Sequence, residues 1–419
     1  MCQMPHPMVQ SRLLVLVVLA LSLATGCRST APRAEAPAVA RAHTVLLVSI
    51  DGMPVSLLGS GTMPTLDGLA GAGVRAGWLK PSFPTLTFPN HYTLVTGLRP
   101  DRHGIVHNNM QDPVLGRFVS KEASGRDGRW WGGEPIWATY QRQGGRSATM
   151  FWPGSEAEIA GARPNDYVPF DGTWTPRRRV DQVLAWLDRP TAQRPGLVTL
   201  YFEQFDVAAH AHGAGSPQAR DALRAIDAAL GHLLAGLESR GLREGTDLVI
   251  VSDHGMIDVP RTQVAILDDV LPATTYTTPW VGMVVGIVPN PGHEDTVTRA
   301  FVRRHAHFTC WDKRSLPAEW RYGTHPRVTP IVCVTDPGWS AMPRAARLGT
   351  SPVRGEHGFA PEAEGMRAVF VADGPSFRDG VQLPPFDNVD IYPLLARLLG
   401  VAPAPNDGTL DAVAPALRD

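Results

Sequence analysis

Cysteine is scarce in this chain of 419 residues, which has only four. None of them has the paired spacing of a cysteine-based metal site, so a structural zinc module of that kind is excluded. An excess of either charge is also absent, because 39 basic and 40 acidic side chains leave a formal net charge of −1. A general nucleic-acid binder needs a basic surface. We therefore expect no nucleic-acid duplex as partner, and no protein partner is evident from the sequence.

Long apolar runs are missing as well. The run Leu13–Leu23, which follows Arg12, is too short to span a bilayer as a stable helix. It ends in small residues that lead to Cys27, as in a signal peptide (residues 1–27) whose cysteine resembles the acylated first residue of a bacterial lipoprotein. We expect an exported bacterial protein of the cell envelope, in the periplasm or as an outer-membrane lipoprotein tethered through Cys27. A plain cleavage region with an incidental thiol is the alternative.

The remainder of the chain divides into a linker and a large body. Residues 28–41 are rich in Ala and Pro and predict a flexible tether, and residues 42–419 form the predicted main domain. Within that domain only Cys310 and Cys333 remain, an even pair in an oxidising compartment. We expect a disulfide between them, and two buried thiols are the alternative.

Short apolar runs rich in Val, Ile and Leu predict buried parallel strands. The clearest runs are Thr44–Ile50, Leu197–Phe202, Asp247–Ser252 and Ala368–Ala372. Helical patterns lie between them, the best at Gln218–Arg240, and a last one follows at Val389–Leu399. This alternation predicts an α/β fold with a mostly parallel central sheet flanked by helices. Residues from about 260 to 350 are irregular and Pro-rich, so we expect them to form a smaller insertion.

Three predicted strands lead into residues that commonly bind metal ions: Asp51, Asp206, and the pair Asp253 and His254. Ligands bind at the carboxyl ends of the strands in open α/β sheets. Carboxylates gathered at one edge repel each other unless cations lie among them. The pattern therefore predicts a metal site at this edge.

Spacing and residue type refine this prediction. Asp206 and His210 are four residues apart, which places them on one side of a helical turn, and mixed His and carboxylate ligands suit zinc. Asp253 and His254 would need a turn to act together, and Gly255 permits one. The plain alternatives are a helix cap with a surface histidine, and a polar loop after a strand.

A hydroxyl nucleophile is suggested near Pro89. Proline fits the first position of a helix, so Thr87 would lie at or just before a helix N-terminus. There the helix dipole favours an alkoxide and the phosphate that it attacks. Thr85 and Ser82 are nearby alternatives, and we expect His91 to be a packed helix residue.

Several stretches together match the motifs of one family. They are Asp51-Gly52, Thr87 to Gly97, Asp101 to Ile105, Asp206 with His210, Asp253 to Met256, Gly355 to Gly358, Asn388 to Asp390 and Asn406 to Thr409. From about Thr44 to Leu410 the chain resembles the nucleotide pyrophosphatase/phosphodiesterase family of the alkaline phosphatase superfamily. In one departure, Phe205 replaces the proline that usually precedes the metal-binding Asp206.

The resemblance implies a site with two zinc ions. One ion would be held by Asp206, His210 and His357, and the other by Asp51, Asp253 and His254 with Thr87. Thr87 would attack phosphorus in line and form a phosphothreonine intermediate, which water then hydrolyses. Asn108 matches a family asparagine whose amide donates to a phosphoryl oxygen, and Asn109 is its rival by position.

The implied reaction is hydrolysis of nucleotide phosphodiester or pyrophosphate bonds with release of a nucleoside 5′-monophosphate. Phe88 resembles the family's base-stacking aromatic, and we expect Tyr201 on the other side of the base unless it is simply core packing. Either Tyr167 or Phe170 would supply a further aromatic ring.

The sequence also bears on four alternative functions. A phosphodiesterase for lipid or choline headgroups is the main alternative, followed by a phosphomonoesterase, although the Asp-Ser-Ala nucleophile site and Arg clamp of that type are missing around Thr87. A sulfatase is excluded because no cysteine lies between Arg28 and Thr309 to become the modified nucleophile. A non-enzymatic lipoprotein would have no reason to carry all these ligands.

Overall fold

The computed structural model describes residues 43–120, 122–346 and 351–418. The predicted signal peptide, the tether and Cys27 lie outside the described residues. Within the described part of the chain, no helix is both long enough and apolar enough to cross a membrane.

A sheet of eight strands forms the centre of the fold, in the order β19-β2-β18-β9-β1-β8-β6-β7. The strands from β9 to β7 are parallel to one another, whereas β18 is antiparallel to both of its neighbours. The bounds are β1 Thr44–Ile50, β2 Val74–Ala76, β6 Ser147–Met150, β7 Asp166–Tyr167, β8 Leu197–Phe202, β9 Thr246–Val251, β18 Phe370–Asp373 and β19 Val381–Leu383. The predicted mostly parallel sheet is confirmed, and β1 and β8 have the predicted bounds.

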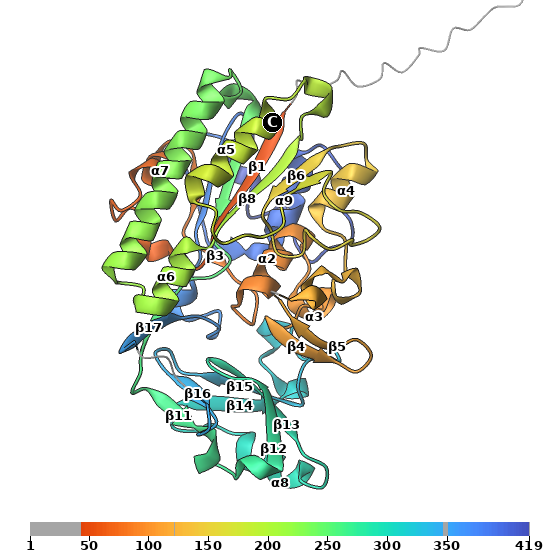
Figure 1. Cartoon of the computed structure of the whole chain (residues 1–419), viewed down its shortest axis with the longest axis vertical. Coiled ribbons are helices and arrows are strands. Elements are labelled where there is room, and N and C mark those ends of the chain that lie inside the picture. Colours follow the sequence, from red (N-terminus) through yellow and green to blue (C-terminus); the bar gives the residue numbers. More distant parts are fainter. Residues whose placement is uncertain (1–42, 121, 347–350, 419) are drawn as a thin grey trace, which may run out of the picture. The chain divides into compact units, whose positions relative to one another are not determined.

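Helices pack around this sheet in two groups (Figure 1). The first group is α1 Pro64–Ala72, α5 Pro176–Leu187, α6 Gln204–His212 and α7 Pro217–Ser239. The second is α2 Thr87–Thr96, α3 Pro100–His103, α4 Ile136–Arg142 and α9 Ile391–Leu398. The apolar stripe predicted for α7 is buried at Leu223, Ile226, Leu230, Leu233 and Leu237. Strands and helices therefore share one continuous core.

A second, smaller sheet has the order β12-β13-β15-β14. Its strands are β12 Tyr276–Trp280, β13 Val284–Pro289, β14 Phe308–Asp312 and β15 Ile331–Thr335, and helix α8 Glu294–Phe301 accompanies them. One face, with Val285 and Ile287, belongs to a core shared with α8, while the other, with Val284 and Val332, joins the main core. We call residues 264–342 the small lobe. We propose that it is the insertion expected from the sequence.

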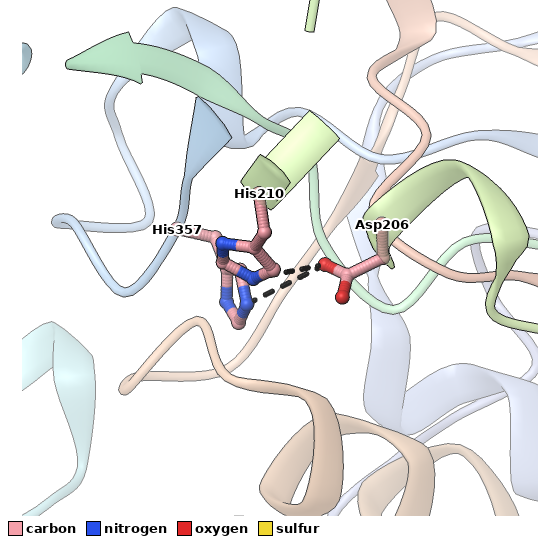
Figure 2. Close-up of side chains that lie close together, drawn as sticks. All are labelled: Asp206, His210 and His357. Carbon is pink, nitrogen blue, oxygen red and sulfur yellow. Dashed lines mark ion pairs between the residues drawn. The ribbon is translucent and has the colours of Figure 1, made fainter. Parts of the chain in front are cut away.

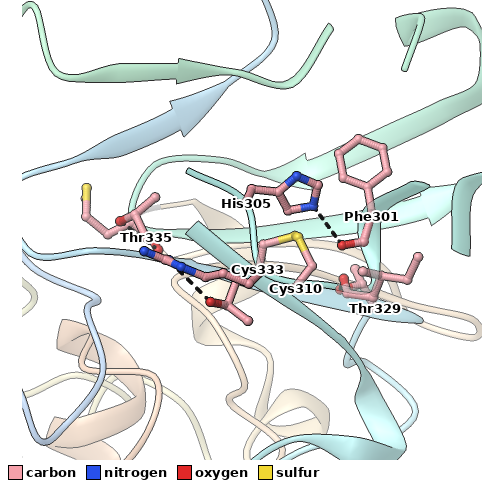
Figure 3. The surroundings of a disulfide bond; sticks show 10 residues. Phe301, His305, Cys310, Thr329, Cys333 and Thr335 are labelled. Atoms are coloured by element: carbon pink, nitrogen blue, oxygen red, sulfur yellow. Dashed lines mark hydrogen bonds between the residues drawn. A yellow bond between two sulfur atoms is a disulfide. The ribbon is translucent and has the colours of Figure 1, made fainter. Parts of the chain in front are cut away.

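The two cysteines of the small lobe form a disulfide, as predicted. Cys310 on β14 and Cys333 on β15 are direct partners in the antiparallel pairing, with their Cα atoms 3.9 Å apart (Figure 3). Both are buried on the α8 face of the sheet. Two short ribbons lie where the chain enters and leaves the lobe: β11 Val264–Ile266 pairs with β16 Ser340–Met342 inside it, and β10 Ile257–Pro260 pairs with β17 Val353–Glu356 just outside it.

Candidate active site

The carboxyl ends of three adjacent strands carry the predicted ligands. Strands β9, β1 and β8 lie side by side, so Asp51 after β1 and Asp253 after β9 emerge at one edge of the sheet. Asp206 follows β8 in the first turn of α6, and His210 lies one turn further along the same helix. The structure therefore brings together all the aspartates that the strand pattern selected.

Asp51, Asp253 and His254 form a buried triad, with each residue at most 1% exposed. The Nε2 atom of His254 lies 2.9 Å from Asp253 Oδ2 and 3.5 Å from Asp51 Oδ1. Asp253 and His254 thus act together, as predicted. Gly255 follows them without a left-handed backbone, and a side chain is excluded there because the carbonyl oxygen of Gly365 lies 2.0 Å from where a Cβ would be.

Asp206, His210 and His357 form a second group, the open triad (Figure 2). The Oδ1 atom of Asp206 faces both imidazoles, at 3.4 Å from His210 Nε2 and 3.6 Å from His357 Nε2. The His357 ring stacks on His254 with centroids 3.7 Å apart, which makes the two triads neighbours. The His210 side chain is 27% exposed, unlike any member of the buried triad.

The electrostatics of both triads fit bound cations. Burial and the carboxylates of Asp253 and Asp206 raise the pKa of Asp51 well above its usual value. Burial lowers the pKa of His210, but Asp206 and Glu356 outweigh that effect and raise it to about 10. Within the described residues, Asp51 Oδ1 and Asp206 Oδ1 are buried without a hydrogen-bond partner. Each triad thus contains a buried carboxylate oxygen that a metal ion would satisfy, in a donor set of His and Asp that suits zinc.

Backbone carbonyls fix the orientation of two imidazoles. His254 Nδ1 lies 2.9 Å from the carbonyl oxygen of Gly255, and His357 Nδ1 lies 2.9 Å from that of Thr85. A hydrogen bond donated from Nδ1 leaves Nε2 as the free lone pair, directed at the carboxylates. This is the arrangement that a metal-binding histidine needs.

Three residues hold the metal-type ligands in place, a role that the sequence did not predict for them. The Tyr201 hydroxyl donates to Asp51 Oδ2 at 2.5 Å, so this side chain holds a ligand in addition to lining the pocket. His91 is fully buried, as expected, but its Nδ1 also lies 3.2 Å from Asp253 Oδ2. Glu356 Oε2 lies 3.4 Å behind His210 Nδ1. Glu356 and His91 both lie in motifs quoted above, Gly355 to Gly358 and Thr87 to Gly97, and Tyr201 was expected only to contact the base.

Thr87 is the first residue of α2, with Leu86 as the N-cap, so it lies at the helix N-terminus as predicted. Pro89 occupies the third helical position rather than the first, which corrects the detail of that prediction. Thr87 Oγ1 is 3.3 Å from His254 Nε2 and lines the cavity that the open triad also lines. The hydroxyl is thus adjacent to both triads.

The alternative nucleophiles make structural hydrogen bonds instead. Thr85 Oγ1 donates to the carbonyl oxygen of Phe359 at 2.8 Å, and Ser82 Oγ donates to Asn388 Oδ1 at 2.9 Å. Both are at most 1% exposed, and neither lines the cavity. The geometry therefore favours Thr87.

Asn108 lines the cavity, whereas Asn109 is exposed on β4 Asn109–Asp112 and does not. Asn108 Oδ1 accepts a hydrogen bond from the backbone N–H of Phe88 at 2.9 Å. With its oxygen bound in this way, the amide keeps its two N–H donors for a ligand. Of the two rival asparagines, only Asn108 is placed to contact a phosphoryl group beside Thr87.

The cavity has a volume of about 310 Å³ and an aromatic side. Phe88, Tyr201 and Phe170 line it, but Tyr167 does not, so Phe170 is the candidate for the further aromatic ring. Phe170 is 41% exposed and reaches into solvent at the cavity. The site therefore combines two groups of metal-type ligands with flat apolar surfaces of the kind that stack on bases.

Residues 45–360 match the family described as Type I phosphodiesterase / nucleotide pyrophosphatase. The chain is 36% identical over 392 residues to an uncharacterized pyrophosphatase/phosphodiesterase of Schizosaccharomyces pombe, which covers 90% of this chain and 81% of that protein. It is 34% identical over 392 residues to ectonucleotide pyrophosphatase/phosphodiesterase family member 3 of Bos taurus, covering 91% of this chain and 45% of that protein. The chain thus spans less than half of the bovine relative.

Among solved structures, murine ectonucleotide pyrophosphatase / phosphodiesterase 5, an inactive Thr-to-Ala variant in complex with AMP, is similar with a TM-score of 0.85. The identity is 32%, and the match covers 90% of this chain and 100% of that one. The chain belongs to the Type I phosphodiesterase / nucleotide pyrophosphatase family. It is accordingly a phosphoric diester hydrolase of the nucleotide pyrophosphatase class with an alkaline phosphatase-like α/β fold, as the resemblance predicted.

Proposed function

We propose that this enzyme hydrolyses nucleotide phosphodiester or pyrophosphate bonds and releases a nucleoside 5′-monophosphate. The observation that carries the proposal is the position of Thr87, whose hydroxyl lies at the N-terminus of α2, next to the buried triad and in the cavity lined by the open triad. A threonine hydroxyl is a weak nucleophile, and the positive end of the helix dipole and a neighbouring metal site are the groups that would activate it.

In this proposal each triad holds one zinc ion, with Thr87 completing the set around the buried triad. Zinc would supply Lewis-acid activation of the hydroxyl and of the phosphoryl oxygens. The donor set supports it, because each triad offers both carboxylate and imidazole atoms within 4.8 Å of one another. Tyr201 and His91 would keep Asp51 and Asp253 in position.

The chain's own residues then perform the transfer. The Thr87 oxygen attacks phosphorus in line, a bond forms between Oγ1 and phosphorus, and the bond to the leaving oxygen breaks. The resulting phosphothreonine is hydrolysed by water, which returns the hydroxyl and releases the monophosphate. Asn108 would donate from its amide to a non-bridging phosphoryl oxygen, where negative charge develops.

A nucleotide is the substrate class that the cavity favours. Phe88, Tyr201 and Phe170 offer ring faces on which a base could stack. The solved relative bound to AMP supports the same class. Glu122, Glu156 and Glu203 also line the cavity beside these rings, so a choline-type headgroup is the alternative that the substrate comparison tests.

We also propose that the protein is exported. The disulfide between Cys310 and Cys333 is typical of an oxidising compartment. Relatives include an ectonucleotide pyrophosphatase/phosphodiesterase of Bos taurus and a venom phosphodiesterase of Crotalus durissus collilineatus, 34% identical over 386 residues, which covers 90% of this chain and 46% of that protein. Bacterial origin, a periplasmic location and a membrane tether through Cys27 remain part of the proposal.

The test compares three substrates with zinc present: a nitrophenyl ester of a nucleoside 5′-monophosphate, nitrophenyl phosphate and glycerophosphocholine. We expect kcat/KM for the nucleotide diester to exceed the other two by several orders of magnitude. Thr87→Ala should lower it by about 10⁴-fold or more. Thr93→Ala on the same helix, buried and away from the cavity, is the matched control. Preference for either other substrate, or full activity of Thr87→Ala, refutes the proposal.

A further inference from the structure

The small lobe contacts the backbone on both sides of Asn108. Residues 104–112, which we call the Asn108 segment, run from the end of α3 through β4. Strand β12 of the small lobe lies in contact with β4, and β4 also pairs with β5 Gly116–Val119. The segment therefore lies in contact with the lobe along β4.

Two lobe residues contact the segment just before Asn108. The buried hydroxyl of Tyr322 donates to the carbonyl oxygen of Val106 at 2.9 Å. Trp280 stacks on the ring of His107, with centroids 4.7 Å apart and planes 11° apart. The same His107 ring accepts a hydrogen bond at Nδ1 from the backbone N–H of Asn109 at 3.1 Å. The residues on either side of Asn108 are thus tied to one ring, and Trp280 holds that ring.

Arg327 fixes both ends of the segment at once. Its guanidinium donates to the carbonyl oxygen of Gly104 at 2.7 Å and to Asp112 Oδ2 at 2.7 Å. A third hydrogen bond of 2.7 Å reaches the carbonyl oxygen of Trp130, over whose ring the guanidinium lies. Arg327 is only 9% exposed, so these contacts are made in a desolvated environment where each is strong.

The loop of the small lobe that carries Arg327 is itself bound to α3. Asp101 on α3 accepts hydrogen bonds from the backbone N–H groups of Gly323, Thr324 and His325, at 3.1, 2.7 and 3.1 Å. The lobe loop that carries Arg327 is thereby attached to the helix that precedes the segment. The lobe therefore binds the Asn108 segment through Arg327, and α3 binds the lobe through Asp101.

We propose that the small lobe acts as a positioning element for Asn108, with Tyr322 and Arg327 as the positioning residues. The inference rests on the proposed function, because it takes Asn108 as the amide that donates to the phosphoryl group. The Asn108 side chain accepts one hydrogen bond from the Phe88 N–H at the start of α2, and its backbone carbonyl oxygen accepts one from the N–H of Ser120 at 3.3 Å. The direction of the amide therefore depends on where the segment's backbone lies relative to α2.

A small displacement of that backbone would reduce the rate without removing any reacting group. Misplacing a catalytic donor by about 1 Å can cost up to about 10²-fold in rate. The loss should fall on kcat more than on KM, because a donor to the developing negative charge acts mainly in the transition state. Metal binding should not change, since neither positioning residue touches a triad.

The experiment is a double-mutant cycle with Tyr322→Phe and Asn108→Ala, measured as kcat/KM for the nucleotide nitrophenyl diester. Tyr276→Phe is the matched control, because Tyr276 is also a buried tyrosine of the small lobe and its hydroxyl has no hydrogen-bond partner in the described part of the chain. We expect Tyr322→Phe to lower kcat/KM about 10-fold when Asn108 is present. In the Asn108→Ala background the same change should cost less than about 2-fold.

Arg327→Lys provides a second variant if Tyr322→Phe is poorly folded, and it should couple to Asn108→Ala in the same way. Equal losses in both backgrounds, or no loss in a folded variant, overturn the inference while the proposed function stands. An activity loss in Tyr276→Phe as large as that in Tyr322→Phe also overturns it. A wild-type enzyme without diester turnover would instead refute the proposed function, and this inference with it.

Discussion

The buried and open triads have nearly the same chemistry at different depths. Asp51, Asp253 and His254 are at most 1% exposed and follow directly from strands of the central sheet. The open triad comes from a helix and from the loop after β17, and its His210 side chain is 27% exposed. Strand ends give the buried triad a rigid frame, and of its members Asp51 lines the cavity, whereas all three members of the open triad do.

The two triads also differ in how many neighbouring groups hold their ligands in place. Asp253 is held by the N–H of Gly52 at Oδ1 and faces both His254 and His91 at Oδ2. His210 has a single carboxylate, Glu356, behind it. A ligand with many fixed neighbours loses little freedom on binding a metal, so we expect the buried triad to bind more tightly than the open one.

The largest expected effect is on kcat/KM, and it distinguishes two buried aspartates at opposite ends of β9. Asp253→Asn should lower kcat/KM by about 10⁴-fold, because the change removes a charged ligand from the buried triad. Asp247→Asn is the control: Asp247 is equally buried but lies near the start of the strand, bound to His43 and Ser376. It should reduce thermal stability and leave kcat/KM within about 2-fold in the folded protein. Similar activity losses in the two variants would contradict this comparison.

An intermediate effect is expected at the open triad. His210→Ala should lower kcat/KM by about 10²-fold at limiting zinc and recover in part when zinc is added in excess, because two ligands of that triad remain. His212 on the same helix lies outside both triads, so His212→Ala serves as the control. A loss greater than that of Asp253→Asn, with no response to zinc, would reverse the proposed order of the two triads.

The smallest effect concerns the support behind His210. Glu356→Gln should weaken zinc binding by about 10-fold, because the imidazole loses the carboxylate that orients it. A zinc-buffer titration of activity measures this shift. Arg354→Met is the control: Arg354 pairs with Glu356 Oε1 at 3.2 Å and donates to the backbone carbonyl oxygen of His210 at 3.2 Å, and its loss leaves the carboxylate behind His210. Equal shifts in both variants would assign the effect to the contacts of Arg354 instead.

The fold and the ligand types were predictable because they depend on local patterns. Strands such as Thr44–Ile50 are mostly apolar in sequence and are buried along their whole length. The ligands follow where those strands end. The division of ligands into two triads came from the family resemblance, since His357 is more than a hundred residues from its partners in the chain. Spacing alone could not have joined it to Asp206.

The supporting contacts were not predictable, because they arise from packing between distant segments. Tyr201 faces inward like its neighbours on β8, and nothing in its sequence context indicates that its hydroxyl meets Asp51. The hydrogen bonds from Tyr322 and Arg327 of the small lobe to the Asn108 segment join residues more than 200 positions apart. Such pairs carry no periodic signal that a single sequence would reveal.

The most direct test of the account is anomalous diffraction at the zinc edge from crystals of the zinc-loaded enzyme. The account predicts two peaks, one at about 2.0–2.2 Å from ligand atoms of Asp51, Asp253 and His254, and one at similar distances from Asp206, His210 and His357. A single peak, or zinc bound away from either triad, would contradict the central claim that both triads are metal sites flanking Thr87.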